Sequence, residues 1–143
     1  MTDRSEFFEA LRYGLQEATG KPIGLSQIPS GEDLQGATLE LPYAIIYPIV
    51  SSSAGAKMSG TEDSKDEVFQ VTSVGKNPKQ AGWMSDRINE VMTMKVGASY
   101  MYPLVDEAWG VEWRLCDQLG ATLPTGRSMF NQFDNYRIRK GRA

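Results

Sequence analysis

The chain contains no histidine and a single cysteine, Cys116, among its 143 residues. Histidine is the usual general base near neutral pH and the commonest side-chain ligand of transition metals, so its absence weakens most enzymatic hypotheses. A single cysteine forms no internal disulfide, and without histidine it provides no zinc site made of nitrogen and sulfur ligands. The chain also lacks a basic leader followed by an apolar run. These absences together predict a cytoplasmic protein.

Long apolar runs and positive charge are also scarce. The longest apolar stretch, residues 44–50, is interrupted by Pro48 and is far shorter than the roughly 20 residues that cross a bilayer, so no membrane span is expected. The net charge of -3 and the pI of about 5.0 argue against a sequence-independent grip on nucleic acid. The contents of 41% hydrophobic and 23% charged residues are typical of globular proteins. We therefore expect one domain that spans residues 1–143.

Two segments have the three- and four-residue spacing of apolar side chains that predicts amphipathic helices. The first is residues 3–19, where Gly20 favours a helix end because it tolerates the left-handed conformation. The second begins at Asn77-Pro78, a capping residue followed by a residue suited to the first helical turn, and ends before Gly97. Their apolar faces consist of Phe7, Phe8, Leu11, Leu15 and Ala18, and of Ala81, Met84, Ile88, Val91 and Met92.

Four segments favour β-strands: residues 42–50, 66–76, 109–116 and 127–139. In the first, Pro48 lacks an amide donor, which predicts an edge strand or a bulge there. The third alternates Trp109, Val111, Trp113 and Leu115 with other residues, which predicts one buried face. Glycine, proline and small polar residues predict a long surface connection at 21–41, a projecting hairpin loop at 51–65 and a turn at 118–126.

The predicted order is helix, strand, strand, helix, strand, strand. Strands joined by loops, with helices at only two places, are typical of a sheet that carries its helices on one side. The sequence therefore predicts an α+β fold in which an antiparallel sheet of about four strands has both helices packed on one face.

The acidic residues offer the best case for a metal site. They form two groups, Glu62, Asp63, Asp66 and Glu67 in one and Asp106, Glu107 and Glu112 in the other. Neither group has the evenly spaced oxygen ligands and central glycine of a calcium loop, and the 51–60 segment matches no phosphate-binding loop. We predict no catalytic residue, no cofactor and no metal, and the acids are expected to be solvated surface residues.

Interaction surfaces are the alternative to a reactive site. The loop at 51–65 is the first candidate, because loops on rigid sheets commonly carry recognition. Trp83 lies beside the apolar stripe of its helix, which predicts partial exposure at an interface. Arginines and lysines near the C-terminus could complement an acidic partner. The candidate interface residues are Ser52, Ser53, Lys57, Met58, Glu62, Asp63, Trp83, Arg137, Arg139, Lys140 and Arg142.

The layout of the whole chain resembles the tail terminator proteins of long-tailed bacteriophages. The segments that carry the resemblance are the N-terminal helix, residues 42–47, the polar loop 51–65, and residues 68–71, 77–81 and 130–136. The resemblance implies a structural virion protein, assembled in the host cytoplasm, that forms a hexameric ring at the head–tail interface. The ring would end polymerisation of the tail-tube protein and contact the head connector, while DNA passes through its lumen. No catalytic residue carries over from this family.

Three other functions remain open on the sequence alone. A neck adaptor or head-completion protein belongs to the same structural class, and would bind the connector instead of the tube. A monomeric regulatory module would bind one soluble partner, and a carboxylate-metal enzyme would be stabilised by divalent ions. Self-association into rings, or binding to assembled tubes, distinguishes the terminator from all three.

Overall fold

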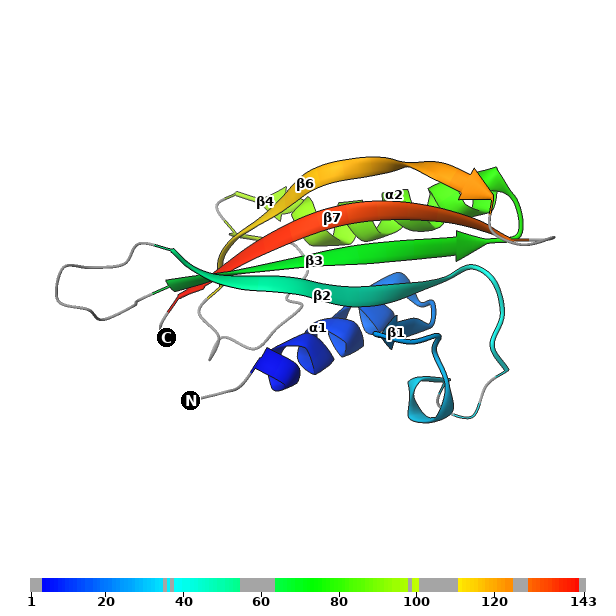
Figure 1. Ribbon diagram of the computed structural model, residues 1–143, viewed down its shortest axis with the longest axis horizontal. Coiled ribbons are helices and arrows are strands. Elements are labelled where there is room, and N and C mark those ends of the chain that lie inside the picture. The colour runs from blue at the N-terminus through cyan, green and yellow to red at the C-terminus, as the bar shows by residue number, and fades with distance from the viewer. Residues whose placement is uncertain are drawn as a thin grey trace, which may run out of the picture.

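The computed structural model describes residues 4–34, 36, 38–54, 64–97, 99–100, 111–124 and 129–141. Two helices, α1 (Arg4–Thr19) and α2 (Pro78–Thr93), accompany a short 3₁₀ helix, η1 (Gly31–Leu34) (Figure 1). The main sheet contains β1 (Ile23–Leu25), β2 (Tyr43–Ala54), β3 (Ser64–Gly75), β6 (Val111–Pro124) and β7 (Phe130–Gly141). A separate two-stranded sheet contains β4 (Lys95–Val96) and β5 (Ser99–Tyr100).

The main sheet is mixed, whereas the sequence predicted an antiparallel one. Its strand order is β1-β2-β3-β7-β6. The four long strands pair in antiparallel fashion, but β1 runs parallel to β2, with Ile23 opposite Ala44 and Leu25 opposite Ile46. β1 has only three residues, too few for a visible alternation, so the segment 21–41 was predicted as a connection. The α+β class and the predicted order of the two helices and four long strands are confirmed.

The strands are also longer than predicted. β2 continues through the serine run to Ala54, which pairs with Ser64 at the start of β3. β6 continues through Gly120 to Pro124, where a turn was predicted. Small polar residues and glycine have weak strand propensity, but here each segment lies beside a long neighbouring strand that supplies its hydrogen bonds. Tertiary pairing therefore overrides the local preference for a loop.

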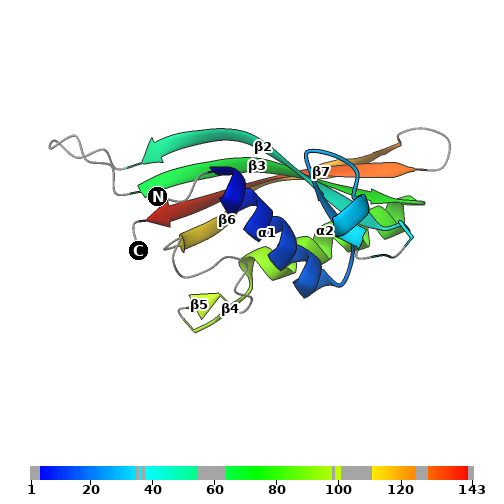
Figure 2. The same ribbon diagram turned by 90° about the horizontal axis from the view of Figure 1, so that it is seen from below.

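Both helices cover the same face of the sheet, as predicted (Figures 1 and 2). Side chains alternate between the two faces of a strand, so one set from each strand meets the helices. The resulting core cluster includes Phe7, Phe8, Leu11 and Leu15 from α1, Met84, Ile88, Val91 and Met92 from α2, and Ala44, Ile46, Phe69, Val71, Tyr136 and Ile138 from the sheet. The helical stripes and this strand face together form one apolar layer.

The ends of the helices follow the sequence signals. Asn77 has an extended backbone, and its side-chain oxygen accepts a hydrogen bond of 2.8 Å from the backbone amide of Gln80. Gly20 follows α1 with a φ of 73°, a conformation that glycine adopts without the steric cost of a side chain. Both features confirm the predicted caps.

Pro48 lies on a part of β2 that β1 does not cover, and the pairing of β2 with β3 is irregular directly after it. Both the predicted edge position and the predicted bulge are therefore found at this residue. The backbone amide of Ala44 donates toward β1, to the carbonyl of Pro22, at 3.1 Å. Alternate residues of a strand point their amides the same way, so the nitrogen of Pro48 faces the side of β2 that β1 no longer covers. A register shift between β2 and β3 follows directly, between Pro48 and Val50. The proline thus removes a donor from the uncovered edge, which disfavours pairing with another strand.

Strand β6 presents a different face to the helices than its tryptophans suggested. Cys116 packs against the main core and Arg114 is buried. The Arg114 guanidinium lies 4.4 Å from the centre of the Tyr100 ring, and the Tyr100 hydroxyl accepts a 2.5 Å hydrogen bond from the Arg114 amide. These contacts fix the β4–β5 sheet against β6. Trp109, and the side chain of Trp113, lie outside the described part of the chain.

Candidate interaction surfaces

The predicted interface residues do not form one described site. Ser52 and Ser53 belong to β2, and Lys140 to β7, although the side chains of these three residues lie outside the description. Lys57, Met58, Glu62, Asp63 and Arg142 lie outside the described residues. The side chains of Arg137, Arg139 and Trp83 are described, and they lie on different elements of the fold.

Arg137 and Arg139, which the sequence predicted at an interface with an acidic partner, form ion pairs within the chain. Both contact the buried carboxylate of Asp66 on β3, Arg139 through a 2.8 Å hydrogen bond from Nε and Arg137 at 3.3 Å. The hydrogen bond from Arg139 is the largest cause that lowers the pKa of Asp66, and Arg137 adds to it. Asp66 lies opposite Arg139 in the sheet, so strand pairing brings the three charges together. Their first role is to join β3 to β7.

Trp83 is partly exposed, as predicted, with 48% of its surface accessible. It belongs to α2 but lies beside the buried stripe, so its indole sits at the margin of the helix layer. The ammonium group of Lys21, in the turn after α1, lies 5.7 Å from the centre of the indole ring. A cation at this distance is attracted by the electron-rich face of the ring. An exposed tryptophan with a cation beside it is typical of the residues that dominate protein interfaces.

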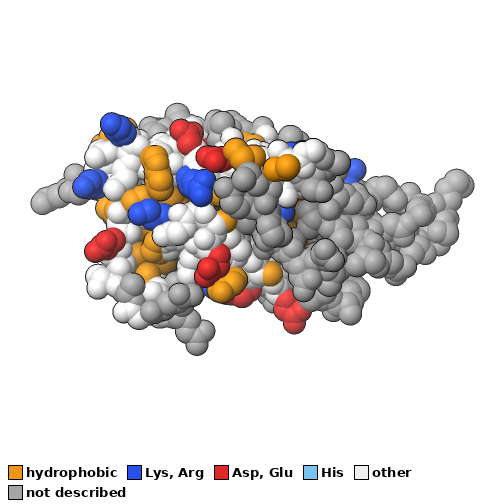
Figure 3. All heavy atoms as spheres, turned by 180° about the vertical axis from the view of Figure 1, so that it is seen from behind, with side chains coloured by type: hydrophobic (Ala, Val, Ile, Leu, Met, Phe, Trp, Pro, Cys, Tyr) orange, Lys and Arg blue, Asp and Glu red, His pale blue; other side chains and the backbone are white. Residues whose placement is uncertain are grey.

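Three cations flank Trp83, and two acidic residues of α2, Asp86 and Glu90, are exposed on the same side of the helix. Lys79 and Arg87 lie one turn before and one turn after it on α2, where four-residue spacing places side chains on one face. Lys79 is exposed, and Arg87 binds both the carbonyl of Ala18 and the carboxylate of Glu90. On the helix-bearing side of the molecule, Figure 3 shows Lys and Arg side chains gathered around hydrophobic ones. We call Lys21, Lys79, Gly82, Trp83 and Arg87 the tryptophan patch.

The exposed face of α1 has the opposite charge, and the sequence prediction did not consider it. Glu6, Glu9, Tyr13 and Glu17 recur at three- and four-residue spacing and are exposed, Tyr13 with 51% of its surface. Arg12, by contrast, is buried, where it binds Glu9 and the carbonyl of Ile23. We call the four exposed residues the acidic stripe. The same periodicity that identified the core side of this helix contained the signal for its outer side.

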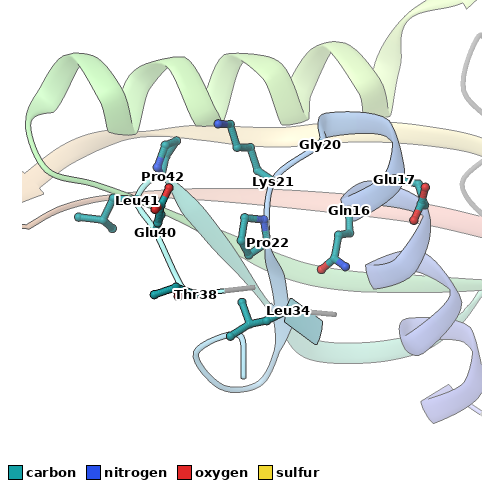
Figure 4. A pocket seen from close by; sticks show the side chains of 10 residues that line it. All are labelled: Gln16, Glu17, Gly20, Lys21, Pro22, Leu34, Thr38, Glu40, Leu41 and Pro42. Carbon is teal, nitrogen blue, oxygen red and sulfur yellow. The ribbon is translucent and has the colours of Figure 1, made fainter. Parts of the chain in front are cut away.

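A pocket of about 380 Å³ lies beside the tryptophan patch. Figure 4 shows that one wall comes from the end of α1 and the turn after it, and the other from the connection that leads to β2. Its lining combines apolar side chains such as Leu34, Leu41 and Pro42 with three charged ones, Lys21, Glu17 and Glu40. The peptide bond between Leu41 and Pro42 is cis. The side-chain amide of Gln80 donates a 3.4 Å hydrogen bond to the carbonyl of Leu41, which connects this wall of the pocket to α2.

A buried polar cluster lies between α2 and the sheet. The carboxylate of Asp134 is fully buried and accepts hydrogen bonds from the hydroxyl of Ser85 and from the backbone amide of Gly120, the latter at 2.9 Å. Gln132 donates to the Ser85 hydroxyl at 2.7 Å. A β-carbon on Gly120 would lie 2.0 Å from the carbonyl oxygen of Phe133, so this close approach of β6 and β7 requires glycine. The cluster fixes α2 to the irregular part of the sheet.

The acidic residues do not gather into a metal site in the described part of the chain. Asp66 and Glu67 are consecutive in β3 and therefore point to opposite faces of the sheet. No group of three or more acidic or cysteine side chains with suitable geometry occurs among the described residues. The second predicted group, which contains Asp106 and Glu107, lies outside them. None of the described helices has the length and apolar character needed to span a membrane.

Comparison with known proteins reveals similarity of fold. No protein-family model matches the chain, and no curated protein matches its sequence. A chain in the virion of a native gene transfer agent particle has a TM-score of 0.53 and 13% identity, with 94% of this chain and 91% of that chain covered. A second solved structure, whose name gives no function, has a TM-score of 0.52 and 13% identity, and covers 98% and 94% of the two chains. The protein therefore shares its fold with a component of that virion.

Proposed function

We propose that the protein is a structural subunit of a virion, which acts as a ring that caps the tail tube and joins the tail to the head connector. The observation that carries this proposal is the similarity to a virion chain over nearly the full length of both chains. An alignment of that extent relates the whole arrangement of helices and strands, not a local motif. Among the possible structural roles in a virion, we choose the one at the end of the tail tube because the sequence resembles tail terminator proteins.

The distribution of polar residues is consistent with a role based on surfaces. The buried polar groups Asp66 and Asp134 are bound by side chains and backbone of neighbouring elements, so each contributes to the structure of the sheet. The two most exposed aromatic side chains of the described residues, Tyr13 and Trp83, instead lie on the helices, together with charges of both signs. Residues of this kind, displayed on a rigid layer, are suited to docking other subunits.

Tube capping can be tested with the purified chain and the polymerised tail-tube protein of the same virion. Electron microscopy should show extra density at tube ends, and addition of the chain during polymerisation should shorten the tubes. A matched variant with both helices intact, Val96→Ala, changes an exposed residue of β4 and serves as control. A chain that ignores tubes but binds the head connector would instead be a neck adaptor, and a chain that binds neither would refute the virion role.

A further inference from the structure

The two helices display complementary surfaces. The tryptophan patch has three cations around Trp83, with Asp86 and Glu90 beside them, whereas the acidic stripe on α1 has three glutamates around Tyr13. Each surface combines one large, half-exposed aromatic ring with charges that are more often positive in the patch and negative in the stripe. Aromatic residues contribute most of the energy at interfaces, and opposite charges guide the approach of the partners.

Gly82 gives the patch a feature that the fold itself does not explain. It lies inside α2, where glycine is less stable than alanine because of its backbone freedom. A β-carbon added at Gly82 would have no atom within 4 Å, so nothing in the described chain requires its absence. Gly75, by contrast, would place a β-carbon 2.4 Å from the backbone nitrogen of Ala81. A glycine with open space above it allows another molecule to approach the helix backbone closely.

We propose that the tryptophan patch of one copy of this chain docks on the acidic stripe of a second copy. Lys79 and Lys21 would meet the glutamates of α1, and Trp83 would pack beside Tyr13 over the bare backbone at Gly82. Both surfaces lie on the helix-bearing side of the molecule (Figure 2), so two copies that face each other make the contact twice, patch on stripe and stripe on patch, which is an isologous pair. The contact goes beyond the proposed function, since it joins two copies face to face and does not by itself build a ring.

The charges allow a test that leaves the helices intact. Lys79→Glu places a negative charge in the first turn of α2, and Glu17→Lys places a positive charge in the last turn of α1. Each substitution suits the helix dipole at that position, so each variant is expected to fold. Each should associate at least tenfold more weakly than the wild type. An equimolar mixture of the two should associate again, because the reversed patch of one variant then meets the reversed stripe of the other.

Sedimentation velocity over a range of concentrations is the measurement for this test. The wild type should form oligomers that weaken when salt is raised from about 0.05 to 0.5 M. Trp83→Ala should weaken association by about 30-fold, which is the usual size of an interface hot spot. Val96→Ala and Lys95→Glu change exposed residues outside both surfaces, and should associate like the wild type.

Three results would overturn the proposal: a wild type that stays monomeric at every concentration, single variants that associate like the wild type, or a mixture that fails to restore association. The tube-capping experiment separates this proposal from the proposed function. A monomeric chain that still caps tubes would refute the self-contact and keep the function. Oligomers with the expected charge rescue that ignore tubes would keep the self-contact and refute the function.

Discussion

The two helices are attached to the same sheet by different means. α1 packs on the long strands through apolar side chains, and the rings of Phe8 and Phe69 meet edge to face with their centres 5.7 Å apart. Its hydrogen bonds to the sheet, from Arg12 and to Gln16, are made with Ile23 of the short edge strand β1. α2 also buries apolar side chains, but it adds the hydrogen bond from Ser85 to Asp134 and a close backbone approach at Gly75. Apolar contacts tolerate small shifts, whereas hydrogen bonds and backbone contacts fix one register. α2 is therefore the better-defined platform for a docking surface.

The largest effect on stability is expected where α1 packs on the long strands through buried apolar side chains. Phe8→Ala should lower the free energy of unfolding by about 4 kcal/mol, because it removes a fully buried ring and leaves a cavity between α1 and β3. Urea denaturation of the variant measures this loss. Phe8→Leu, which fills most of the space, should recover more than half of it. Equal losses for the two variants would show that this contact depends on the ring's geometry and not on its volume.

A smaller loss is expected where α2 approaches the sheet closely. Gly75→Ala should lower the free energy of unfolding by about 3 kcal/mol, because its β-carbon would overlap the backbone at Ala81 and force the start of α2 outward. Thermal unfolding monitored by circular dichroism measures the change. A variant as stable as the wild type would show that the start of α2 can shift freely and that this backbone contact does not fix its position.

The polar attachment of α2 is tested at Asp134. Asp134→Ala should cost about 2 kcal/mol, because it leaves the Gly120 amide and the Ser85 hydroxyl without their buried acceptor. Asp134→Asn keeps an oxygen acceptor and should cost less. Amide hydrogen exchange gives a second readout, since loss of the acceptor should speed exchange at Gly120. If Asp134→Asn cost as much as Asp134→Ala, the negative charge, and not the acceptor oxygen alone, would be the stabilising feature.

The ion pairs of Asp66 with Arg137 and Arg139 lie on the face of the sheet that the helices do not cover. They predict that the stability of the fold decreases in acid. The pKa of Asp66 is below its ordinary value of 3.8 in the folded chain, mainly because Arg139 donates to the carboxylate. Its contribution to stability is therefore complete above pH 3.8 and is lost as the pH falls below that value. Arg139 and Arg137 are 33% and 37% exposed, so solvent screens the pairs, and Asp66→Asn should cost only about 1 kcal/mol at neutral pH.

Unfolding experiments at pH 5 and at pH 2.5 test this assignment. The wild type should lose more stability over that interval than Asp66→Asn, because the amide does not titrate. Arg139→Gln should reduce the acid sensitivity more than Arg137→Gln, since Arg139 is the larger cause of the lowered pKa. Identical pH profiles for the wild type and Asp66→Asn would assign the acid sensitivity to another carboxylate.

The smallest effect is expected on the outer side of α2, and it has the opposite sign. Gly82→Ala should raise the free energy of unfolding by roughly 0.5–1 kcal/mol, because alanine is the better helix former and its β-carbon meets nothing within 4 Å. The same substitution should weaken association, since it fills the space that the second copy requires. A variant that is more stable and associates unchanged would remove Gly82 from the interface.

Prediction from the sequence succeeded where the signal lies within a few residues. The two helices and their caps at Asn77 and Gly20 were predicted, as was the partial exposure of Trp83. Prediction failed where pairing with another strand decides the outcome. Ser51–Ala54 and Gly120–Pro124 have loop-like composition, yet each pairs with the next strand of its hairpin, at residues 64–67 and 130–132. The ion pairs of Arg137 and Arg139 with Asp66 were not predicted, because nothing local indicates that Asp66 lies across the sheet, and their contact with a partner stays a prediction.

The sequence by itself determined the helices, their boundaries and the apolar layer, because periodicity, capping and turn chemistry act over one or two turns of chain. Only the tertiary structure decided that β1 pairs parallel to β2, that β7 lies between β3 and β6, and that Asp134 lies beneath Ser85. These pairings depend on hydrogen bonds and burial between segments far apart in sequence, whose partners no local pattern specifies. The charges on the two helices were visible in the sequence, but their placement on one layer required the fold.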